Sequence, residues 1–434
     1  MDKKKLPSAL HILLAVLPAL GLGFLQLVAP AGYAQKISKH EIEQGRDILR
    51  NVKSEFMKNY YDPTFHGMDI EERFKLADEK MKKAESNAQV FGIIAQVLLD
   101  LNDSHTSFSP PLRTLRVEYG WQMKPLGGDC YVSAVKPGSD AQAKGLTVGD
   151  KVLSIDGRPM DRTKVWLAKY LYYTLRPQPA MALIVQKFDG QQKQFIIQAR
   201  VRDRNLELDA EEEDRLRRQR FYKPNDDVLI WKMPQFDLSE DEVDDKVGLF
   251  RNRKALILDL RGNPGGYVNT LERFAGHFFT HDVKIADLKG RKEMKPMIAK
   301  GHNQKAFKGK LIVLVDGESS SASEIFARVI QLEKRGTVIG DRTAGMVMQS
   351  KFYPLQFGAV KAIYFGINVT DADLVMTDGK SLEHVGVNPD ELLLPAPEDL
   401  AANRDPVLAH AASLVGVKLD PEKAGALFPI EWRK

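Results

Sequence analysis

The sequence predicts a multidomain α/β protein with a small helical N-terminal domain, a small β-rich domain and an α/β core. The 434 residues are too many for a single hydrophobic core. Between residues 36 and 112, apolar residues recur at helical spacing, whereas residues 115–203 contain short β-type runs separated by Gly and Pro turns. Beyond residue 227 the apolar runs become nearly continuous, which is typical of strands covered on both faces.

The composition narrows the possible classes. The chain is 43% hydrophobic and 28% charged, and its formal charge of +5 is spread along the sequence without a basic stripe. A nucleic-acid partner is therefore not expected. The single cysteine, Cys130, excludes an intrachain disulfide and a cysteine-based metal cluster. Because Cys130 lies in an apolar run, we expect it to be buried rather than reactive.

The N-terminus resembles an export signal. Three lysines at positions 3–5 precede an apolar run over residues 10–28, and small residues ending at Ala34 follow. This order predicts a signal peptide over residues 1–34 and a mature chain in the periplasm or outside the cell. The alternative is an uncleaved membrane anchor, because the run is nearly long enough to span a bilayer.

The helical N-terminal domain is predicted over residues 36–112. Leu49, Val52 and Phe56 fall on one helical face, and a second apolar face recurs between residues 91 and 101. The pair Pro110-Pro111 ends this domain.

The β-rich domain over residues 115–203 carries an ordered set of turn motifs. Strand-like runs at 131–135 and 151–155 flank Pro-Gly-Ser-Asp-Ala-Gln-Ala-Lys-Gly-Leu, and Gly-Asp-Lys-Val-Leu-Ser-Ile-Asp-Gly spans the second run. This order resembles a PDZ domain of bacterial proteases. The resemblance implies a groove that adds a peptide as an edge strand, with Tyr119, Gly120 and Trp121 in the loop that holds a terminal carboxylate. A small β-domain of another kind is the alternative.

The remaining chain is predicted to contain three segments. Residues 204–226 are rich in opposite charges at helical spacing, which indicates a solvated helix or linker. The core spans residues 227–397, with predicted strands at 254–260, 310–315 and 337–340. Residues 398–434 are predicted to form a helix that packs on the core, followed by a tail.

Two loops that follow core strands carry the candidate chemistry. Gly265 and Gly266 close the first loop, where bare backbone amides could hold an oxyanion or could simply form a tight turn. In the second loop, Ser321 and Ala322 begin a helix whose N-terminal amides favour an attacking oxygen. The spacing of Ser321 and Glu324 also fits a capping box, which needs no catalysis.

Taken together, the loop motifs resemble a known family. Asp-Leu-Arg-Gly-Asn-Pro-Gly-Gly at 259–266, Ser-Ser-Ala-Ser-Glu at 320–324 and Gly-Asp-Arg-Thr-Ala-Gly at 340–345 are similar to the C-terminal processing peptidases and the tricorn core protease. The resemblance implies a ClpP/crotonase-like core. It also implies that Ser321 is the nucleophile, with an oxyanion hole formed by the amide of Ala322 and that of Gly265 or Gly266.

The sequence departs from the family at the catalytic base. The lysine used by many tail-specific proteases falls at Met346, whose thioether cannot accept the proton. The tricorn-like branch instead implies His105 as the base, oriented by Ser104, which is in turn held by Glu383. A lone histidine in such a turn is ordinarily a surface or capping residue. His384 is a rival base, and an extended segment would point it away from Glu383.

These patterns predict a serine endopeptidase that cleaves unfolded or C-terminal segments of exported polypeptides without a cofactor. No histidine pair shows metal-ligand spacing of the His-Glu-x-x-His kind, so no metal site is expected. The alternative, prompted by Met346, is a catalytically inactive scaffold whose PDZ groove binds partner tails.

Overall fold

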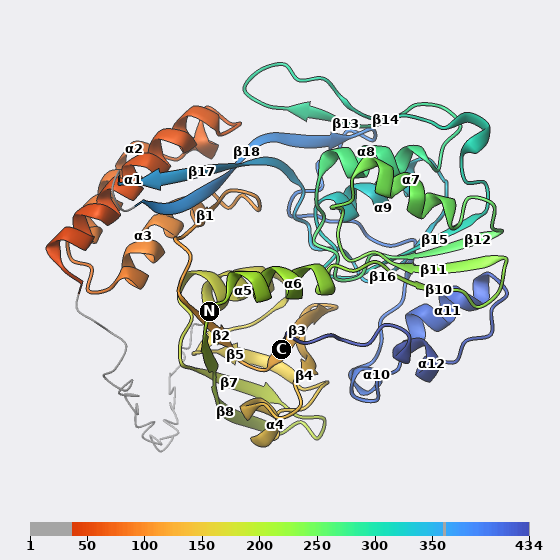
Figure 1. The fold of residues 1–434 in the computed structure, drawn as a ribbon, viewed down its shortest axis with the longest axis horizontal. Coiled ribbons are helices and arrows are strands. Elements are labelled where there is room, and N and C mark those ends of the chain that lie inside the picture. Colours follow the sequence, from red (N-terminus) through yellow and green to blue (C-terminus); the bar gives the residue numbers. More distant parts are fainter. Residues whose placement is uncertain (1–36, 359–361, 434) are drawn as a thin grey trace, which may run out of the picture. The chain divides into compact units, whose positions relative to one another are not determined.

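The computed structural model describes residues 37–358 and 362–433 (Figure 1). The predicted signal segment lies outside these residues. None of the helices that the structure describes is long and apolar enough to cross a membrane. Three helices form the N-terminal region: α1 (Lys39–Asn59), α2 (Ile70–Met81) and α3 (Asn87–Leu99).

The N-terminal helices share a hydrophobic cluster with a β-sheet of the core. Val52, Phe56 and Ile94 are fully buried between the helices, and the cluster extends to Ile367 on strand β18 (Ile363–Met376). Strand β1 (Ser107–Ser109) leaves the helical region and pairs antiparallel with β18. The chain therefore enters the core sheet immediately after the helices, which brings their C-terminal end toward the core.

A PDZ-type sheet follows, in the order β3 (Trp121–Leu126), β4 (Asp129–Val135), β5 (Lys151–Ile155), β7 (Ala180–Gln186) and β8 (Gln192–Gln198), with β6 (Arg158–Pro159) on β5. Helices α4 (Asp140–Ala143) and α5 (Val165–Lys169) accompany it. Strand β3 lies at one end of the sheet order, as a peptide-binding edge requires. Cys130 is buried in this domain, as predicted.

Strands β2 (Leu115–Glu118) and β9 (Arg200–Asp203) form a separate pair at the two ends of the PDZ segment. The charged segment that follows contains α6 (Leu206–Leu216). Residues near the C-terminus return to this helix and to the PDZ region: Arg215 pairs with Glu431, and Lys136 Nζ donates to the Arg433 carbonyl at 2.5 Å.

The central sheet of the core has the order β10 (Arg220–Tyr222), β11 (Val228–Lys232), β12 (Ala255–Asp259), β15 (Lys310–Val315), β16 (Thr337–Gly340) and β19 (Glu391–Leu392). All neighbours from β11 to β19 are parallel. The three core strands predicted from the apolar runs are present. Because parallel strands end at the same edge, the loops after β12 and β15 lie next to each other.

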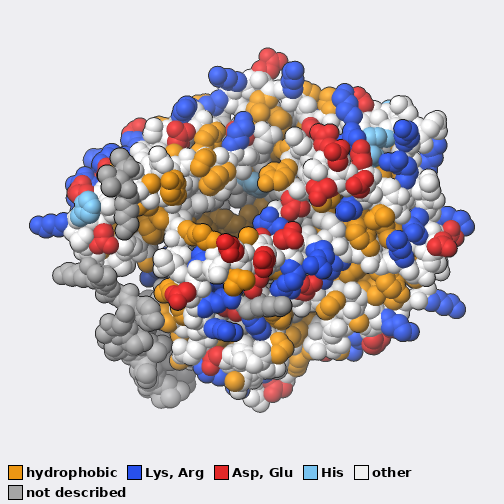
Figure 2. All heavy atoms as spheres, in the orientation of Figure 1, with side chains coloured by type: hydrophobic (Ala, Val, Ile, Leu, Met, Phe, Trp, Pro, Cys, Tyr) orange, Lys and Arg blue, Asp and Glu red, His pale blue; other side chains and the backbone are white. Residues whose placement is uncertain are grey.

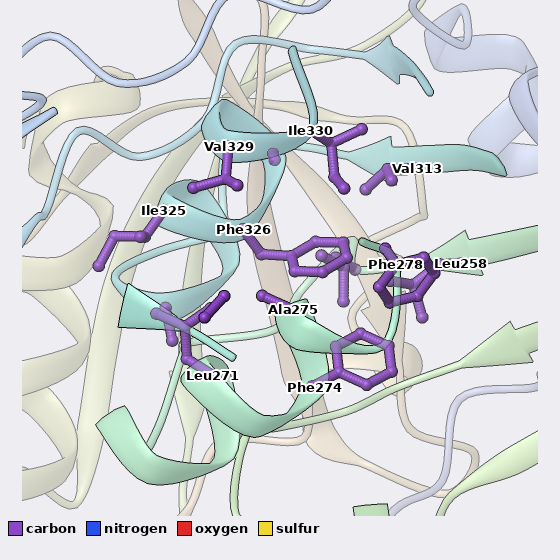
Figure 3. Close-up of a cluster of buried hydrophobic side chains, with 14 of the residues drawn as sticks. Leu258, Leu271, Phe274, Ala275, Phe278, Val313, Ile325, Phe326, Val329 and Ile330 are labelled. Atoms are coloured by element: carbon purple, nitrogen blue, oxygen red, sulfur yellow. The ribbon is translucent and has the colours of Figure 1, made fainter. Parts of the chain in front are cut away.

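Alternate residues of the central strands face two different helical layers. One layer contains α7 (Glu240–Gly248), α8 (Val268–Gly276) and α9 (Ala322–Leu332), and the other contains α11 (Pro406–Leu414) and α12 (Pro421–Ala426). Figure 3 shows Phe326 of α9 pointing toward Phe274 and Phe278. Phe274 lies in the last turn of α8, and Phe278 lies just after this helix. This aromatic cluster fixes α9, and with it the loop that precedes α9.

A second core sheet contains β13 (Val283–Lys289), β14 (Met297–Ala299), β18, β1 and β17 (Met348–Phe357), which forms a long antiparallel hairpin with β18. This hairpin is not among the elements predicted from the sequence. Short helical turns at Phe65–Gly67, Arg162–Lys164, Tyr170–Leu175, Asn303–Lys305 and Pro397–Ala401 complete the described structure.

Replacing Phe326 by alanine should lower the free energy of unfolding by about 3–5 kcal/mol, because a fully buried ring is lost and a cavity remains. Urea denaturation followed by circular dichroism measures this change. Phe352→Ala, the same substitution at a side chain that is 55% exposed on β17, should cost less than about 1 kcal/mol. Equal losses in the two variants would contradict the packing role of Phe326.

Candidate active site

Ser321 lies at the N-cap of α9, in the loop after β15. Its backbone has φ +55° and ψ −119°, a conformation that L-residues rarely adopt and that is found at functional sites. The Ser321 amide donates to the Met346 carbonyl at 2.9 Å and to Glu324 at 3.1 Å. These contacts hold the strained residue so that Ser321 Oγ lies 3.2 Å from His105 Nε2.

The four residues predicted to form a catalytic relay lie within hydrogen-bonding distance of one another in the predicted order, from Ser321 through His105 and Ser104 to Glu383. Ser104 Oγ lies 2.8 Å from His105 Nδ1 and donates to Glu383 Oε2 at 2.8 Å. The Ser104 amide donates to the other Glu383 oxygen at 2.9 Å. Because an ionised carboxylate only accepts, Ser104 oxygen is left to accept from Nδ1–H, and Nε2 is then free to accept from Ser321.

Burial sets the charge states of this relay. It lowers the pKa of His105 to about 4, so the imidazole is neutral near pH 7 and can accept a proton. Burial raises the pKa of Glu383, while hydrogen bonds from Val347 N and from Ser104 stabilise its ionised form. The arrangement therefore suits proton transfer from Ser321 to His105.

Asp103 anchors the histidine loop and was not singled out from the sequence. Its Oδ1 accepts from the amides of His105 at 2.8 Å and Thr106 at 3.0 Å, and from Thr370 Oγ1 at 2.7 Å on β18. One buried carboxylate oxygen thus ties the end of the helical region to the core sheet. The sequence signal is an Asp followed two residues later by the histidine whose amide it holds, which is an Asx-turn pattern.

Glu324 is also more than the capping residue that its spacing indicates. Its buried carboxylate accepts from the amides of Ser321, Gly345 at 2.8 Å and Met346 at 2.9 Å, and from Thr343 Oγ1 at 2.5 Å. Burial raises the pKa of Glu324 to about 7. Glu324 therefore fastens the 343–346 loop, including the position of the missing lysine, to the Ser321 loop.

The glycine loop packs directly on the serine loop. A Cβ at Gly265, where φ is +94°, would lie 2.7 Å from Ser321 Cβ and 2.8 Å from Ala322 N. The Gly265 amide already donates to Asn263 Oδ1 at 2.8 Å. Within residues 37–358 and 362–433, the amides of Gly266 and Ala322 have no protein acceptor. Of the two glycine amides considered from the sequence, only that of Gly266 is free for a ligand.

The segment that carries His384 is not extended, so the condition under which His384 would point away from Glu383 is not met. The 382–386 segment is a turn with His384 at φ +60°, not an extended strand. His384 Nε2 consequently lies 3.6 Å from Glu383 Oε1 and 2.8 Å from the Asn102 carbonyl. His384 thus contacts the relay from outside, while His105 faces Ser321.

The PDZ residues Tyr119 and Trp121 point into the domain core and are 1% and 4% exposed. The Tyr119 hydroxyl donates to the Gln178 carbonyl at 3.0 Å. Gly120 has φ +72°, and a Cβ there would lie 2.4 Å from Ser139 Cβ. These side chains therefore shape the loop, and any contact with a peptide would come from its backbone.

A cavity of about 1180 Å³ opens beside the relay. Its lining includes Ser104, Ser320 and Met346, together with residues of α2, α3 and α5. Figure 2 shows this hollow near the centre of the molecular face, with hydrophobic side chains on its wall. A cavity of this size, open to solvent, accommodates several residues of an extended polypeptide.

Across residues 37–358 and 362–433, no group of three or more His, Cys, Asp or Glu side chains is arranged to hold a metal ion. His277 contacts Asp244 at 2.7 Å and stacks on His302.

A serine within reach of a buried neutral histidine, next to free backbone amides on an α/β core, is typical of serine hydrolases. Residues 227–393 match the family model of Peptidase family S41, and residues 117–166 match that of the PDZ domain. Residues 227–393 therefore form a peptidase domain of the family S41 type and residues 117–166 belong to a PDZ domain, and the protein is a serine peptidase.

Relatives extend this assignment over most of the chain. Carboxy-terminal processing protease CtpB of Bacillus subtilis is 23% identical over 84% of this chain and 78% of its own length. Tail-specific protease of Haemophilus influenzae is 25% identical over 65% of this chain, which spans only 42% of that protein. Mature CPAF has the same fold, with a TM-score of 0.63 at 14% identity, covering 83% of this chain and 94% of that one.

Glu324 should make stability depend on pH. Its pKa is raised from 4.5 to about 7 in the folded state, so the folded protein holds a proton that the unfolded chain releases. Its contribution to the free energy of unfolding is therefore full below pH 4.5 and is lost as the pH rises through about 7, by on the order of 3 kcal/mol. Urea denaturation at a series of pH values across this range should show that the free energy of unfolding falls more steeply with rising pH in wild type than in Glu324→Gln.

Glu333→Gln, at the exposed end of the same helix, is the matched control and should retain the wild-type pH dependence. A Glu324→Gln profile that parallels wild type would contradict the raised pKa of Glu324.

Proposed function

We propose that this serine peptidase cleaves unfolded or C-terminal segments of exported polypeptides through an acyl-enzyme on Ser321. The observation that carries the proposal is the 3.2 Å contact between Ser321 Oγ and His105 Nε2, backed by Ser104 and Glu383. His105 takes the role of the base that Met346 cannot fill.

In the first step, Ser321 Oγ attacks the scissile carbonyl carbon while its proton passes to His105 Nε2. The amides of Ala322 and Gly266 donate to the resulting oxyanion, and Gly265 supplies the open space beside them. The carbon–nitrogen bond then breaks and His105 returns the proton to the leaving amine. Water attacks the acyl-enzyme by the reverse proton path, which releases the acid product and restores Ser321.

The PDZ domain would deliver the substrate. The free edge of β3 can add an extended peptide as a further strand, and the loop around Gly120 can offer backbone amides to a terminal carboxylate. The names of the curated relatives, carboxy-terminal processing and tail-specific proteases, support tails as substrates. Action outside the cytoplasm, with a cleaved signal peptide or a membrane tether, rests on the apolar N-terminal run.

The inactive-scaffold alternative is weaker. It was prompted by the absent lysine, and the loop with Met346 is instead fastened to the nucleophile loop by Glu324 and faces a complete histidine relay. A scaffold has no need for a neutral buried histidine against a strained serine.

Fluorophosphonate labelling of residues 35–434 tests the nucleophile directly. We expect modification of Ser321 in wild type, none in Ser321→Ala, and a labelling rate at least about a hundredfold lower in His105→Ala, because the base is lost. Mass spectrometry locates the label. Wild-type labelling by His105→Ala would refute the relay, and no labelling even with a candidate C-terminal peptide present would favour the scaffold.

The glycine loop offers a second test with a matched control. Gly265→Ala places a Cβ 2.8 Å from Ala322 N and should reduce labelling of Ser321 by at least about a hundredfold. Gly262→Ala in the same loop also has positive φ, +71°, but its Cβ meets nothing within 4 Å. This control should lose about 1 kcal/mol of stability and keep its labelling rate. Equal labelling of both variants would contradict the role of Gly265 in keeping the space beside the Ala322 amide open.

A further inference from the structure

The cavity beside the relay concentrates positive charge. Eight of its lining side chains are basic, whereas three are acidic. The formal charge of +5 includes +3 from residues 1–36 and one lysine each at positions 361 and 434, so the described residues sum to zero. The excess at the cavity is therefore a local feature of the fold and does not reflect a generally basic protein.

Most of these cations have no acidic partner. Three of the eight are paired, with Asp100, Asp341 and Glu318. Within residues 37–358 and 362–433, the other five are exposed and form no salt bridge: Lys80, Lys83, Arg158, Arg176 and Arg342. Unpaired cations around a concave opening reinforce one another, because the low-dielectric walls focus their field into the opening.

The five cations come from all three parts of the described chain. Two lie at the C-terminal end of α2, two border the PDZ helices, and Arg342 lies in the core loop that also carries the Glu324 partners. Apolar side chains also line the cavity, among them Leu76, Val97 and Trp166. A polypeptide that reaches Ser320 and Met346 through this opening passes both an apolar wall and a basic rim.

We propose that the cavity selects polypeptide segments that carry aspartate or glutamate side chains near the scissile bond. This inference rests on the proposed peptidase function and adds the substrate class. Carboxylates on the segment would meet the unpaired cations at the rim, while the apolar side chains between them contact the wall. The C-terminal carboxylate of a tail carries the same chemistry, so the experiment must separate the two sources.

The test compares two fluorescent peptides of one sequence, with two Asp residues or with two Asn residues beside the candidate cleavage site. Each is made with a free and with an amidated C-terminus. Affinity for the Ser321→Ala variant is measured by anisotropy, and kcat/KM is measured for wild type. We expect about tenfold tighter binding and faster turnover of the Asp peptide at low salt, in both terminal forms, shrinking at high salt.

A matched pair of variants locates the effect. The double variant Lys80→Gln/Lys83→Gln should reduce the ratio of the affinities for the Asp and Asn peptides by at least about threefold. The double variant Lys292→Gln/Lys295→Gln removes the same charge from an exposed loop outside the cavity and should leave this ratio of affinities unchanged. An equal effect of the two double variants would overturn the cavity as the source of selection.

The outcomes separate the two levels of the proposal. If wild type cleaves neither peptide but Ser321→Ala still prefers the Asp peptide, the substrate class stands and the peptidase function fails. If both peptides bind and are cleaved equally, the substrate class is overturned while the peptidase function stands. A preference for the Asp peptide that vanishes when the C-terminus is amidated would also overturn the proposed substrate class, because the terminal carboxylate would then be the recognised group.

Discussion

The pairing of β1 with β18 is the constraint on which the candidate site depends. His105 lies two residues before β1, in a loop whose direction is set by that pairing and by the contacts of Asp103 and Thr106 with Thr370. Without this junction, the loop that carries His105 would lose the backbone pairing that directs it toward Ser321. Three residues of strand and one buried carboxylate therefore bring the base to the nucleophile across 216 positions of sequence.

On the other side of the site, the strained serine is supported by the core. The aromatic cluster around Phe326 fixes α9, and Glu324 in the first turn of α9 binds the amides of the neighbouring loop. These hydrogen bonds hold in place the loop in which Met346 occupies the position of the family's lysine. Its carbonyl at Met346 and the carboxylate of Glu324 share the Ser321 amide, which maintains the unfavourable backbone conformation.

Contacts between the PDZ region and the core extend the site. Arg162 forms a nearly buried ion pair with Asp341, next to the loop whose Thr343 binds Glu324. Lys169 of α5 pairs with Glu318, three residues before Ser321. The cavity wall is consequently built by three parts of the chain. The charge on that wall arises from their meeting, because each part alone contributes only one or two of the unpaired cations.

Local sequence determined much of this protein. Turn motifs and apolar runs predicted the PDZ strands and the buried strands of the core, since buried parallel strands need continuous apolar residues. Motif resemblance singled out Ser321, His105, Ser104 and Glu383, which the structure brings within hydrogen-bonding distance of one another.

What only the tertiary structure decided depends on distant segments meeting. Packing between distant segments accounts for the features that the sequence did not predict. They are the β17–β18 hairpin, the several hydrogen-bond partners of Glu324, the hydrogen bond from the Gly265 amide to Asn263, and the turn at His384. A side chain's type and spacing encode its own helix or strand. The partners it meets, and the charge that collects where domains adjoin, are set only when those elements pack together.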